Sequence, residues 1–408
     1  MPIADGVDRL SFRYPSLLVD HIAEHEPGRR IVTVKNVTVS EEFFQGHFPG
    51  EPLLPGVLMI ESFTQAATLL LPTARVSLRG VNNAKFRKQV VPGDRLRIEV
   101  SLARRRGDVV RANAVATVAG QMVAEAELVL AVQDEAAQID PAAHVAPGAQ
   151  LGAGSIIGPH AAIGPNVVLG RNVRVGASAV VDGHTSIGDG TEVFPFASIG
   201  MPPQDLKYKG EPTRLDIGRR NIFREFVTIH RGTAGGGGKT TIGDRNLFMN
   251  YVHIAHDCRV GNDTIFGPGA TLGGHVFVDD FATISAYSGV HQFCRVGRHA
   301  FIGGYSVVTK DALPFAKTVG ARSLCRVYGL NTIGLIRRGF DEATIRKLKS
   351  AYRYLLQSKL NATQALQKIE SEPSLASPEV EYLVTFIRTA SRGAILKRGK
   401  VADADTDL

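Results

Sequence analysis

The chain has 408 residues, of which 44% are apolar and 21% are charged, and its formal net charge is +8. This length suits two domains, the well-mixed charges exclude a disordered chain, and no apolar run is long enough for a membrane span. The start does not resemble a secretory signal and three cysteines lack metal-type spacing, so we expect a cytoplasmic protein with no membrane insertion. Basic residues are dispersed and tryptophan is absent, which argues against nucleic acid as a partner, while the net charge favours anionic partners.

Residues 1–135 form the first predicted domain. An apolar run that ends at Leu71 predicts one helix, and the alternating segments 96–100 and 109–132 predict strands. We therefore expect an α+β domain in which an antiparallel sheet wraps a central helix. Glu61 interrupts the apolar run of that helix, which marks it as a candidate functional carboxylate.

Four short motifs stand out in this domain. They are Arg13-Tyr-Pro, Gly46-His-Phe-Pro-Gly, Pro55-Gly-Val-Leu-Met-Ile-Glu and Val91-Pro-Gly-Asp. Together they resemble the 3-hydroxyacyl-acyl carrier protein dehydratases, which have the hot-dog fold. The resemblance implies that His47 takes the alpha proton of the acyl chain, and that Glu61 from the partner subunit of a dimer helps the hydroxyl group depart. The alternative is a domain that has lost activity and serves only for dimerisation or carrier-protein binding.

Residues 136–320 form the second predicted domain, in which an aliphatic residue or phenylalanine recurs at every sixth position. The series starts at Ile139 and ends at Val308, with two interruptions. A period of six fits a triangular coil of three hexapeptides whose aliphatic residues point inward. We therefore predict a left-handed parallel β-helix. The interruptions, at residues 201–214 and 232–239, must loop outward, and long loops on a rigid scaffold often carry function.

The repeat also predicts where histidines lie on the β-helix. With 18 residues per coil, His256, His275, His291 and Gln292 fall within three positions of one corner, and His253 lies just before it. Imidazoles gathered in this way bind metal or act as acid-base groups. The His-x4-His spacing of comparable zinc sites is absent, so we predict no metal and no other cofactor. A metal-dependent β-helix enzyme and a non-catalytic carrier-binding scaffold are the alternatives.

Seven stretches from the second half of the chain add a more specific signal. They are Phe196-Ala-Ser-Ile-Gly, Gln204-Asp-Leu-Lys-Tyr, Gly210-Glu-Pro-Thr-Arg, Val227-Thr-Ile-His-Arg-Gly, His253-Ile-Ala-His-Asp-Cys, Val290-His-Gln-Phe-Cys and Arg337-Arg-Gly-Phe. They resemble the UDP-N-acetylglucosamine acyltransferases that begin lipid A biosynthesis. The resemblance implies that His256 is the general base and that the backbone N–H of Gly274 stabilises the oxyanion, while the neighbouring carboxylate of Asp257 is placed to orient His256.

The same resemblance implies binding roles for ten further residues. Asp205, Lys207, His230, His253, His275, His291 and Gln292 are implied to bind substrate, Gly304 to help set acyl length, and Arg337 and Arg338 to contact a phosphate or the carrier protein.

Residues 321–408 form the last predicted domain, a C-terminal α-helical appendage. Apolar residues recur at helical spacing from Ile345 to Leu356, Asp341 fits the N-cap position, and a further helix is predicted from Val380 to Thr389. Basic residues gather before and within the first of these helices. They indicate either a solvated face or a docking surface for acidic acyl carrier protein.

These features predict a bifunctional enzyme. We expect an acyl-[acyl carrier protein]:UDP-N-acetylglucosamine 3-O-acyltransferase of the first step of lipid A biosynthesis, with a second activity as an (R)-3-hydroxyacyl-carrier dehydratase. An N-acyltransferase acting on a 3-amino UDP-sugar is the alternative for the acceptor. The expected partners are acyl carrier protein, UDP-N-acetylglucosamine and further copies of the chain. We expect a trimer through the β-helix, and a hexamer if hot-dog dimers join trimers.

Overall fold

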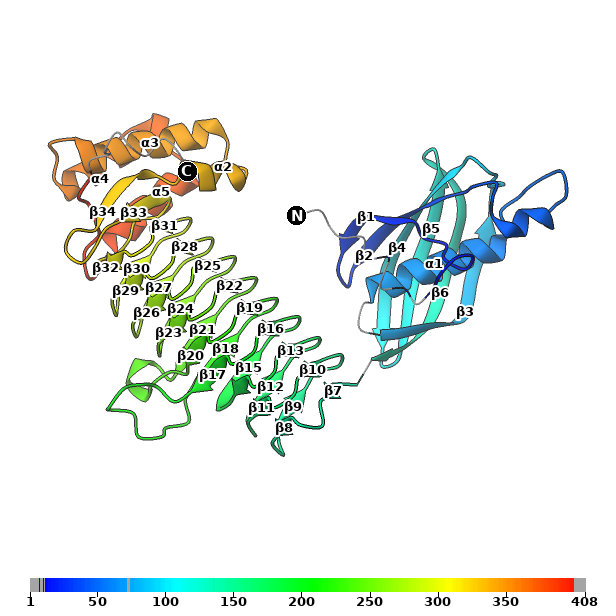
Figure 1. Cartoon of the computed structure of the whole chain (residues 1–408). Helices are drawn as coiled ribbons and strands as arrows, with labels where there is room; N and C mark the ends of the chain where they lie inside the picture. Colours follow the sequence, from blue (N-terminus) through cyan, green and yellow to red (C-terminus); the bar gives the residue numbers. More distant parts are fainter. Residues whose placement is uncertain (1–6, 8–9, 11, 72–73, 135, 400–408) are drawn as a thin grey trace. The chain divides into compact units, whose positions relative to one another are not determined.

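The computed structural model describes residues 7, 10, 12–71, 74–134 and 136–399 (Figure 1). It divides the chain into two compact units, Met1–Glu135 and Ala136–Leu408. Residues 400–408 of the predicted C-terminal domain lie outside the described part. None of the helices in the described part combines the length and the apolar character that crossing a bilayer requires.

The first unit is a six-stranded antiparallel sheet with one long helix on its face (Figure 1). In the order β1-β2-β4-β5-β6-β3, the strands are β1 (His21–Glu26), β2 (Arg30–Asn36), β4 (Arg95–Arg106), β5 (Val109–Val118), β6 (Gln121–Asp134) and β3 (Ala74–Phe86). A short 3-10 helix, η2 (Glu42–Gln45), precedes the long helix α1 (Gly56–Leu70). Phe63 and Leu70 of α1 are fully buried in one core with Ile98 and Leu128 of the sheet, and removal of this apolar surface from water holds the helix in place. The arrangement confirms the predicted hot-dog domain.

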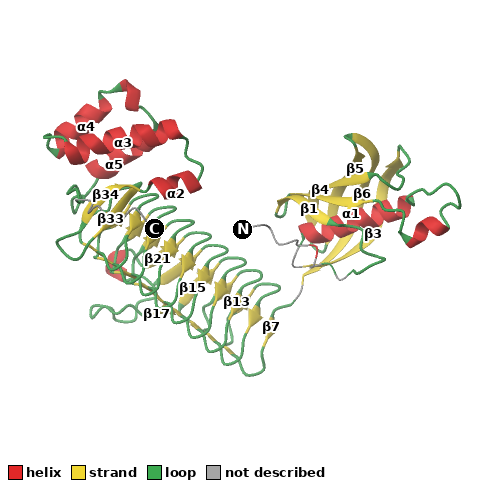
Figure 2. Cartoon of the chain, turned by 45° about the horizontal axis from the view of Figure 1, so that its top comes forward, coloured by secondary structure: helices red, strands yellow, loops and turns green. Residues whose placement is uncertain are grey.

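The second unit begins with a β-helix whose coils stack as three parallel sheets (Figures 1 and 2). The first sheet contains β7 (Gln138–Ile139), β10 (Ile156–Ile157), β13 (Arg174–Val175), β16 (Glu192–Val193), β19 (Ile222–Phe223), β22 (Leu247–Phe248), β25 (Ile265–Phe266), β28 (Thr283–Ile284), β31 (Phe301–Ile302), β33 (Ala316–Val319) and the antiparallel β34 (Arg326–Leu330). The second sheet contains β8 (His144–Val145), β11 (Ala162–Ile163), β14 (Val180–Val181), β17 (Ser198–Met201), β20 (Thr228–His230), β23 (His253–Ile254), β26 (Thr271–Leu272), β29 (Gly289–Val290) and β32 (Val307–Val308). The third sheet contains β9 (Gln150–Leu151), β12 (Val168–Leu169), β15 (His184–Ile187), β18 (Arg214–Ile217), β21 (Lys239–Ile242), β24 (Arg259–Val260), β27 (Phe277–Val278) and β30 (Arg295–Val296).

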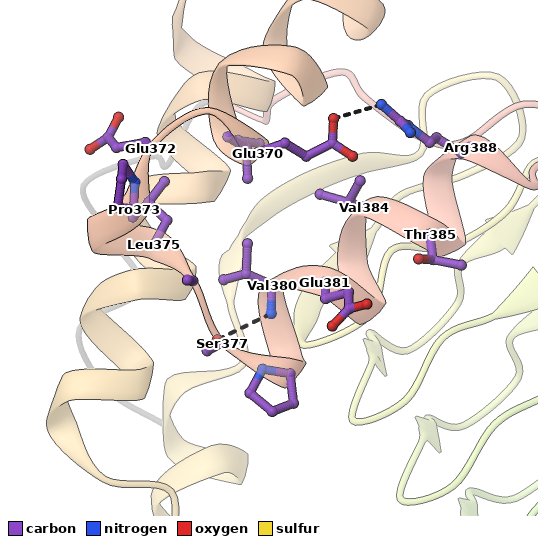
Figure 3. Close-up of a pocket in the computed structure, with 13 residues that line it drawn as sticks. Glu370, Glu372, Pro373, Leu375, Ser377, Val380, Glu381, Val384, Thr385 and Arg388 are labelled. Carbon is purple, nitrogen blue, oxygen red and sulfur yellow. Dashed lines mark hydrogen bonds and ion pairs between the residues drawn. The ribbon is translucent and has the colours of Figure 1, made fainter.

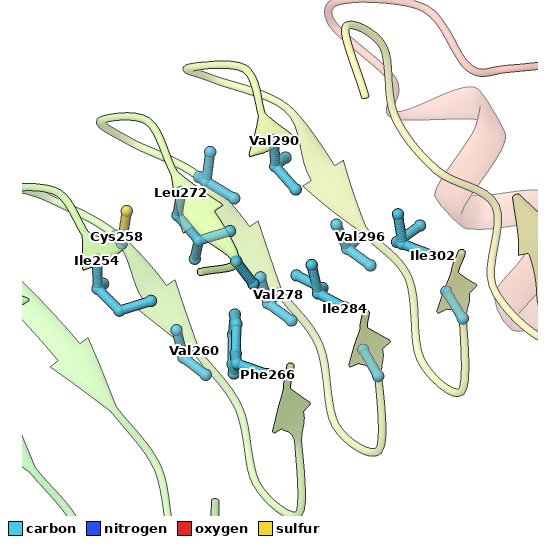
Figure 4. Packing of buried hydrophobic residues seen from close by; sticks show 14 of the residues in the cluster. Ile254, Cys258, Val260, Phe266, Leu272, Val278, Ile284, Val290, Val296 and Ile302 are labelled. Carbon is cyan, nitrogen blue, oxygen red and sulfur yellow. The ribbon is translucent and has the colours of Figure 1, made fainter. Parts of the chain in front are cut away.

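The six-residue period explains this architecture directly. The last residue of almost every short strand is the aliphatic or aromatic residue of the repeat, and equivalent residues stack at intervals of about one coil. Figure 4 shows the resulting column, in which Ile254, Leu272 and Val290 lie in one row. These side chains are almost completely buried, so the coils share one continuous apolar core and the predicted left-handed β-helix is confirmed.

The corners between sheets form three long edges of the prism, each carrying residues with positive φ. The histidine edge follows the second sheet and contains Asp257, His275 and Phe293; the aromatic edge follows the first sheet and contains Tyr251, Tyr287 and Tyr305; the third edge follows the third sheet and contains Phe281, His299 and Phe315. Rings stack along each edge, for example His275 on Phe293 with centroids 4.4 Å apart and Tyr287 on Tyr305 at 5.4 Å. Each edge therefore presents a separate set of side chains.

Both predicted outward loops leave the histidine edge. The first loop, residues 202–213, follows β17, and the second loop, residues 231–238, follows β20 and includes the 3-10 helix η3 (Ala234–Gly236). Arg231 holds the first loop, because its guanidinium donates to Tyr208 Oη at 3.0 Å and to the carbonyl of Gly200 at 3.0 Å. The loops protrude beside β17 and β20 in Figure 1.

In the part of the chain that the structure describes, four α-helices close the far end of the β-helix (Figure 2), which confirms the helical appendage. They are α2 (Thr332–Arg337), α3 (Glu342–Gln357), α4 (Ala362–Glu370) and α5 (Pro378–Arg388), with the 3-10 helix η4 (Pro373–Leu375) before α5. Asp341 caps α3 as predicted, accepting from the Thr344 N–H at 2.7 Å. The short helices α2 and α4 were not predicted from the sequence.

A cavity of about 600 Å³ lies among α4, η4 and α5 (Figure 3). Glu370 and Arg388 form an ion pair beside it, with Oε2 and Nη2 2.6 Å apart. None of the predicted site residues lines this cavity.

Candidate active site

His256 and Asp257 lie at the corner directly after β23, on the histidine edge. The Nδ1 atom of His256 is 2.7 Å from Oδ2 of Asp257, and because a carboxylate only accepts hydrogen bonds, Nδ1 carries the donated proton. Nε2 is then the nitrogen with a free lone pair. The Asp257 side chain is 1% exposed and that of His256 is 16% exposed, so the carboxylate is shielded while the imidazole edge is open. This arrangement suits a general base held by a buried carboxylate.

Gly274 lies against the His256 ring on the next coil. A Cβ atom at this position would stand 2.6 Å from Cε1 and 2.8 Å from Nε2 of His256, so only glycine fits. Among the described residues the Gly274 N–H has no hydrogen-bond partner. The Cys258 thiol donates to the carbonyl of Gly273 at 3.1 Å, which fixes the peptide plane that carries this N–H. A free donor on a residue packed against the His256 ring suits a developing oxyanion.

Three further histidines surround this pair. The His275 ring meets the His256 ring edge-on at 5.2 Å, and its Nε2 is 3.8 Å from Asp257 Oδ2. His230 and His253 also meet edge-on at 4.9 Å, and His253 Nδ1 is 2.8 Å from the hydroxyl of Thr228.

The surrounding imidazoles are neutral near pH 7. Burial lowers the pKa of His230 to about 4, and burial, followed by the neighbouring His256, lowers the pKa of His253. Burial likewise lowers the pKa of His275, although Asp257 opposes the shift. His230 is 4% exposed, and within the described part of the chain its Nδ1 has no hydrogen-bond partner. It therefore offers an unused polar atom to a ligand.

The remaining predicted residues of this edge lie around the cluster. Asp205 on the first loop is half-buried and accepts from the Lys207 N–H at 2.9 Å, and its charge acts on His275. Lys207 is exposed. His291 and Gln292 follow β29 at the next turn of the same edge, where His291 is half-buried and Gln292 is exposed.

Gly304, Arg337 and Arg338 do not join this cluster within one chain. Gly304 follows β31 and lies on the aromatic edge, next to Tyr305. Arg338 covers the ring of Phe281 on the third edge, with its guanidinium carbon 4.8 Å from the ring centroid. Arg337 is the last residue of α2 and is exposed. The predicted site is therefore divided among different edges of the prism.

His256, Asp257 and His275 also form a group whose potential metal-ligand atoms lie within 4.8 Å of one another. The carboxylate of Asp257 is already engaged, because Oδ1 accepts from the Thr233 N–H at 2.9 Å and Oδ2 accepts from the Thr233 hydroxyl at 2.7 Å as well as from His256. A metal ion at Oδ2 would displace these bonds. The contacts favour an acid-base pair over a metal centre.

In the first unit, His47 and Glu61 lie in separate pockets. His47 Nδ1 is 2.8 Å from the carbonyl of Leu53, which can only accept, so Nε2 again has the free lone pair. The pocket of His47 is also lined by Met59 and Phe86, whereas Glu61 lines another pocket with Phe43 and further residues. The Gln65 amide donates to Glu61 Oε1 at 3.0 Å. One chain does not bring His47 and Glu61 together.

Sequence reasoning missed Thr233, Gly236 and Thr240, which hold Asp257 in place. The Thr240 hydroxyl accepts from the Asp257 N–H at 2.8 Å, and the second loop presses Gly236 against the Asp257 carboxyl group. The second loop was predicted to leave the repeat, but its contact with Asp257 on the next coil had no signal in the sequence.

Comparisons with known proteins agree with the fold. A FabA-like domain matches residues 10–127, the six-repeat bacterial transferase hexapeptide model matches residues 239–274, and domain 2 of UDP-N-acetylglucosamine O-acyltransferase matches residues 311–395. The fold and the site thus define a hexapeptide-repeat transferase that carries a FabA-like hot-dog domain.

The curated relatives carry a more specific name. Acyl-[acyl-carrier-protein]–UDP-N-acetylglucosamine O-acyltransferases are 46% identical in Alkalilimnicola ehrlichii, over 49% of this chain and 76% of that protein, and 47% identical in Thermodesulfovibrio yellowstonii, over 52% and 81%. The solved UDP-N-acetylglucosamine acyltransferase of Francisella novicida is 37% identical with a TM-score of 0.61, over 64% of this chain and 95% of that one. That of Bacteroides fragilis is 44% identical with a TM-score of 0.57, over 64% and 98%. The chain belongs to the UDP-N-acetylglucosamine O-acyltransferase family.

Proposed function

We propose that the chain transfers an (R)-3-hydroxyacyl group from acyl carrier protein to the 3-hydroxyl of UDP-N-acetylglucosamine, the first step of lipid A biosynthesis. The observation that carries the proposal is the His256–Asp257 pair with Gly274 against its ring, within a family whose members bear this name. The neutral imidazoles of His230, His253 and His275, with Asp205, Lys207, His291 and Gln292, surround the place where the sugar nucleotide binds.

The proposed reaction follows from the positions of the hydrogen-bonding atoms. Nε2 of His256 takes the proton of the sugar 3-hydroxyl while that oxygen attacks the thioester carbonyl carbon. The Gly274 N–H donates to the resulting oxyanion. When the carbon–sulfur bond breaks, the imidazolium returns the proton to the departing thiolate of the carrier. Asp257 keeps the ring orientation throughout, because Nδ1 remains bonded to its buried carboxylate.

Turnover tests this proposal. The intact chain is incubated with (R)-3-hydroxyacyl-carrier protein and either UDP-N-acetylglucosamine or its 3-amino analogue, and the products are identified by mass spectrometry. We expect an O-acylated sugar from the first acceptor. If only the amino sugar gives a product, the chain is an N-acyltransferase. If neither acceptor gives a product, the proposal of acyl transfer is contradicted.

We further propose that the first unit dehydrates (R)-3-hydroxyacyl chains on the same carrier. His47 Nε2 takes the alpha proton, and Glu61 of a second subunit protonates the departing hydroxyl group. The free Nε2 of His47 and the position of Glu61 in a separate pocket support a site shared between two subunits.

The division of site residues among edges supports an assembly of several chains. If β-helices pack side by side as a trimer, the aromatic or third edge of one chain can face the histidine edge of the next, so that Gly304, Arg337 or Arg338 completes a neighbour's site. Hot-dog dimers then join two trimers. We expect light scattering of the purified chain to give the mass of six chains, and a stable trimer would contradict the dimeric role of the first unit.

Gly304 provides a test of acyl-length selection. A Cβ atom at Gly304 would meet only the carbonyl oxygen of Ala286, at 3.5 Å, which is an ordinary contact. We expect Gly304→Met to reduce turnover of the preferred acyl chain at least about tenfold relative to chains several carbons shorter, because the new side chain occupies the space that we assign to the end of the acyl chain. Competition assays with mixed acyl-carrier substrates measure this ratio.

The neighbouring glycine is the matched comparison. A Cβ atom at Gly303 would stand 2.7 Å from Cγ2 of Val319, so Gly303→Ala is expected to lower the melting temperature without changing chain-length preference. An unchanged chain-length preference in Gly304→Met would show that Gly304 does not contact the acyl chain.

A further inference from the structure

The second loop makes an extensive polar contact with the Asp257 side chain. The Thr233 N–H donates to Oδ1 at 2.9 Å and the Thr233 hydroxyl donates to Oδ2 at 2.7 Å. Thr233 is 8% exposed and the Asp257 side chain is 1% exposed, so both bonds are shielded from water. A shielded hydrogen bond to a charged carboxylate restrains its orientation strongly.

These bonds continue into the loop and into the imidazole. The Thr233 hydroxyl oxygen accepts from the Gly236 N–H at 3.1 Å while its hydrogen points to Oδ2 of Asp257, and the same Oδ2 accepts from Nδ1 of His256. The direction of every donor is determined, because an N–H can only donate and an ionised carboxylate can only accept. Gly236, Thr233 and His256 therefore belong to one hydrogen-bond network whose donors converge on the Asp257 carboxylate from the loop on one side and from the imidazole on the other.

The loop reaches the carboxylate only because residue 236 has no side chain. A Cβ atom on Gly236 would stand 2.1 Å from Cγ and Oδ2 of Asp257, a distance at which the carboxyl group must move. Glycine at position 236 therefore allows the backbone of the second loop to pack directly against the Asp257 carboxylate.

We infer that Thr233 is a positioning residue for the acyl transfer proposed above: it fixes the Asp257 carboxylate and, through it, the tautomer and orientation of the His256 base. This inference rests on the proposed function for its kinetic test and on geometry alone for its structural test. Thr233 itself touches neither substrate nor reacting atoms in this scheme.

Thr233→Val is the most informative variant, since it removes the hydroxyl group, keeps the shape and keeps the backbone N–H. We expect kcat to fall about 10- to 100-fold, with KM for both substrates within about twofold, because a misoriented base slows chemistry more than binding. Thr233→Ser restores the hydroxyl group and should recover most of the lost kcat. The matched control is Thr33→Val in β2 of the first unit, a buried threonine whose hydroxyl has no partner among the described residues. Its kcat should equal that of the unmodified chain.

Wild-type kcat in Thr233→Val would overturn the inference, as would a loss that Thr233→Ser does not recover. A crystal structure of Thr233→Val tests the geometry even if neither acceptor is acylated by the intact chain. We expect the Asp257 carboxylate to rotate and the distance from its Oδ2 to His256 Nδ1 to exceed hydrogen-bonding range. An unchanged distance of 2.7 Å between Asp257 Oδ2 and His256 Nδ1 would contradict the positioning role of Thr233, whatever reaction the chain performs.

Discussion

His256→Ala should reduce acyl transfer by about three orders of magnitude, the range that loss of a general base produces. The substitution removes the imidazole whose Nδ1 is bonded to the buried Asp257 and whose ring packs against Gly274. Single-turnover acylation of UDP-N-acetylglucosamine, followed by mass spectrometry, measures the loss. Since the ring contributes little to the apolar core, the melting temperature should change by only a few degrees.

His160→Ala provides the matched control, because His160 is an exposed histidine on a coil far from the histidine cluster. It should retain full acyl transfer. The dehydratase reaction of the first unit should also survive in His256→Ala. If His256→Ala keeps more than about a tenth of the wild-type kcat, another group is the base, and His275 at 3.8 Å from the same carboxylate becomes the first candidate.

His47→Ala and Glu61→Gln should each abolish formation of the enoyl product while leaving acyl transfer intact. Each removes one member of the proposed acid-base pair, and general acid-base groups typically contribute about 100-fold or more. The change in absorbance of the enoyl thioester, with acyl-sugar formation measured in parallel, separates the two activities. Loss of both activities in either variant would point instead to failure of assembly.

A mixture of the two variants tests whether the site is shared. In one chain His47 and Glu61 line separate pockets. If Glu61 comes from the partner subunit, a dimer of one His47→Ala chain and one Glu61→Gln chain has one intact site. Co-expression of the variants in equal amounts should therefore restore about a quarter of the dehydratase activity. Absence of recovery, despite mixed dimers verified by mass spectrometry, would place both residues in a site within one chain.

Much of the second unit could be predicted because its sequence and the packing of its coils repeat with the same period. A residue such as Ile254 or Leu272 occupies the same place in every coil, so its burial follows from counting alone. The same counting placed His256 and His275 on one edge, and the structure confirms that their rings are in contact range at 5.2 Å. The sheet and central helix of the first unit were predicted by a different signal, the alternation of its strands and one apolar run, whereas the hot-dog fold was implied by the family resemblance of four short motifs.

Contacts made by the irregular segments could not be predicted in this way. Thr233 lies on a loop outside the repeat, and its partner Asp257 is 24 residues away in the sequence. No local sequence pattern therefore predicts this hydrogen bond. The separation of Gly304 from His256 is a different case, because it follows from the repeat phase. The family resemblance nevertheless grouped the two residues, since it implies the residues of a whole site, including those that a neighbouring chain would supply. The roles of the individual site residues remain predictions that the variants above test.

The strict coil length of the β-helix bears on how such a chain can change in evolution. Gain or loss of one whole coil leaves every later residue on its own edge, and it only lengthens or shortens the stack. Gain or loss of a single hexapeptide is tolerated by the apolar column but turns all later residues by one edge. An insertion of this kind between Asp257 and Gly274 would separate the base from its oxyanion donor while every inward residue stayed inward. Outside the histidine cluster, insertions in this fold are therefore compatible with its chemistry as whole coils or as loops that leave the corners.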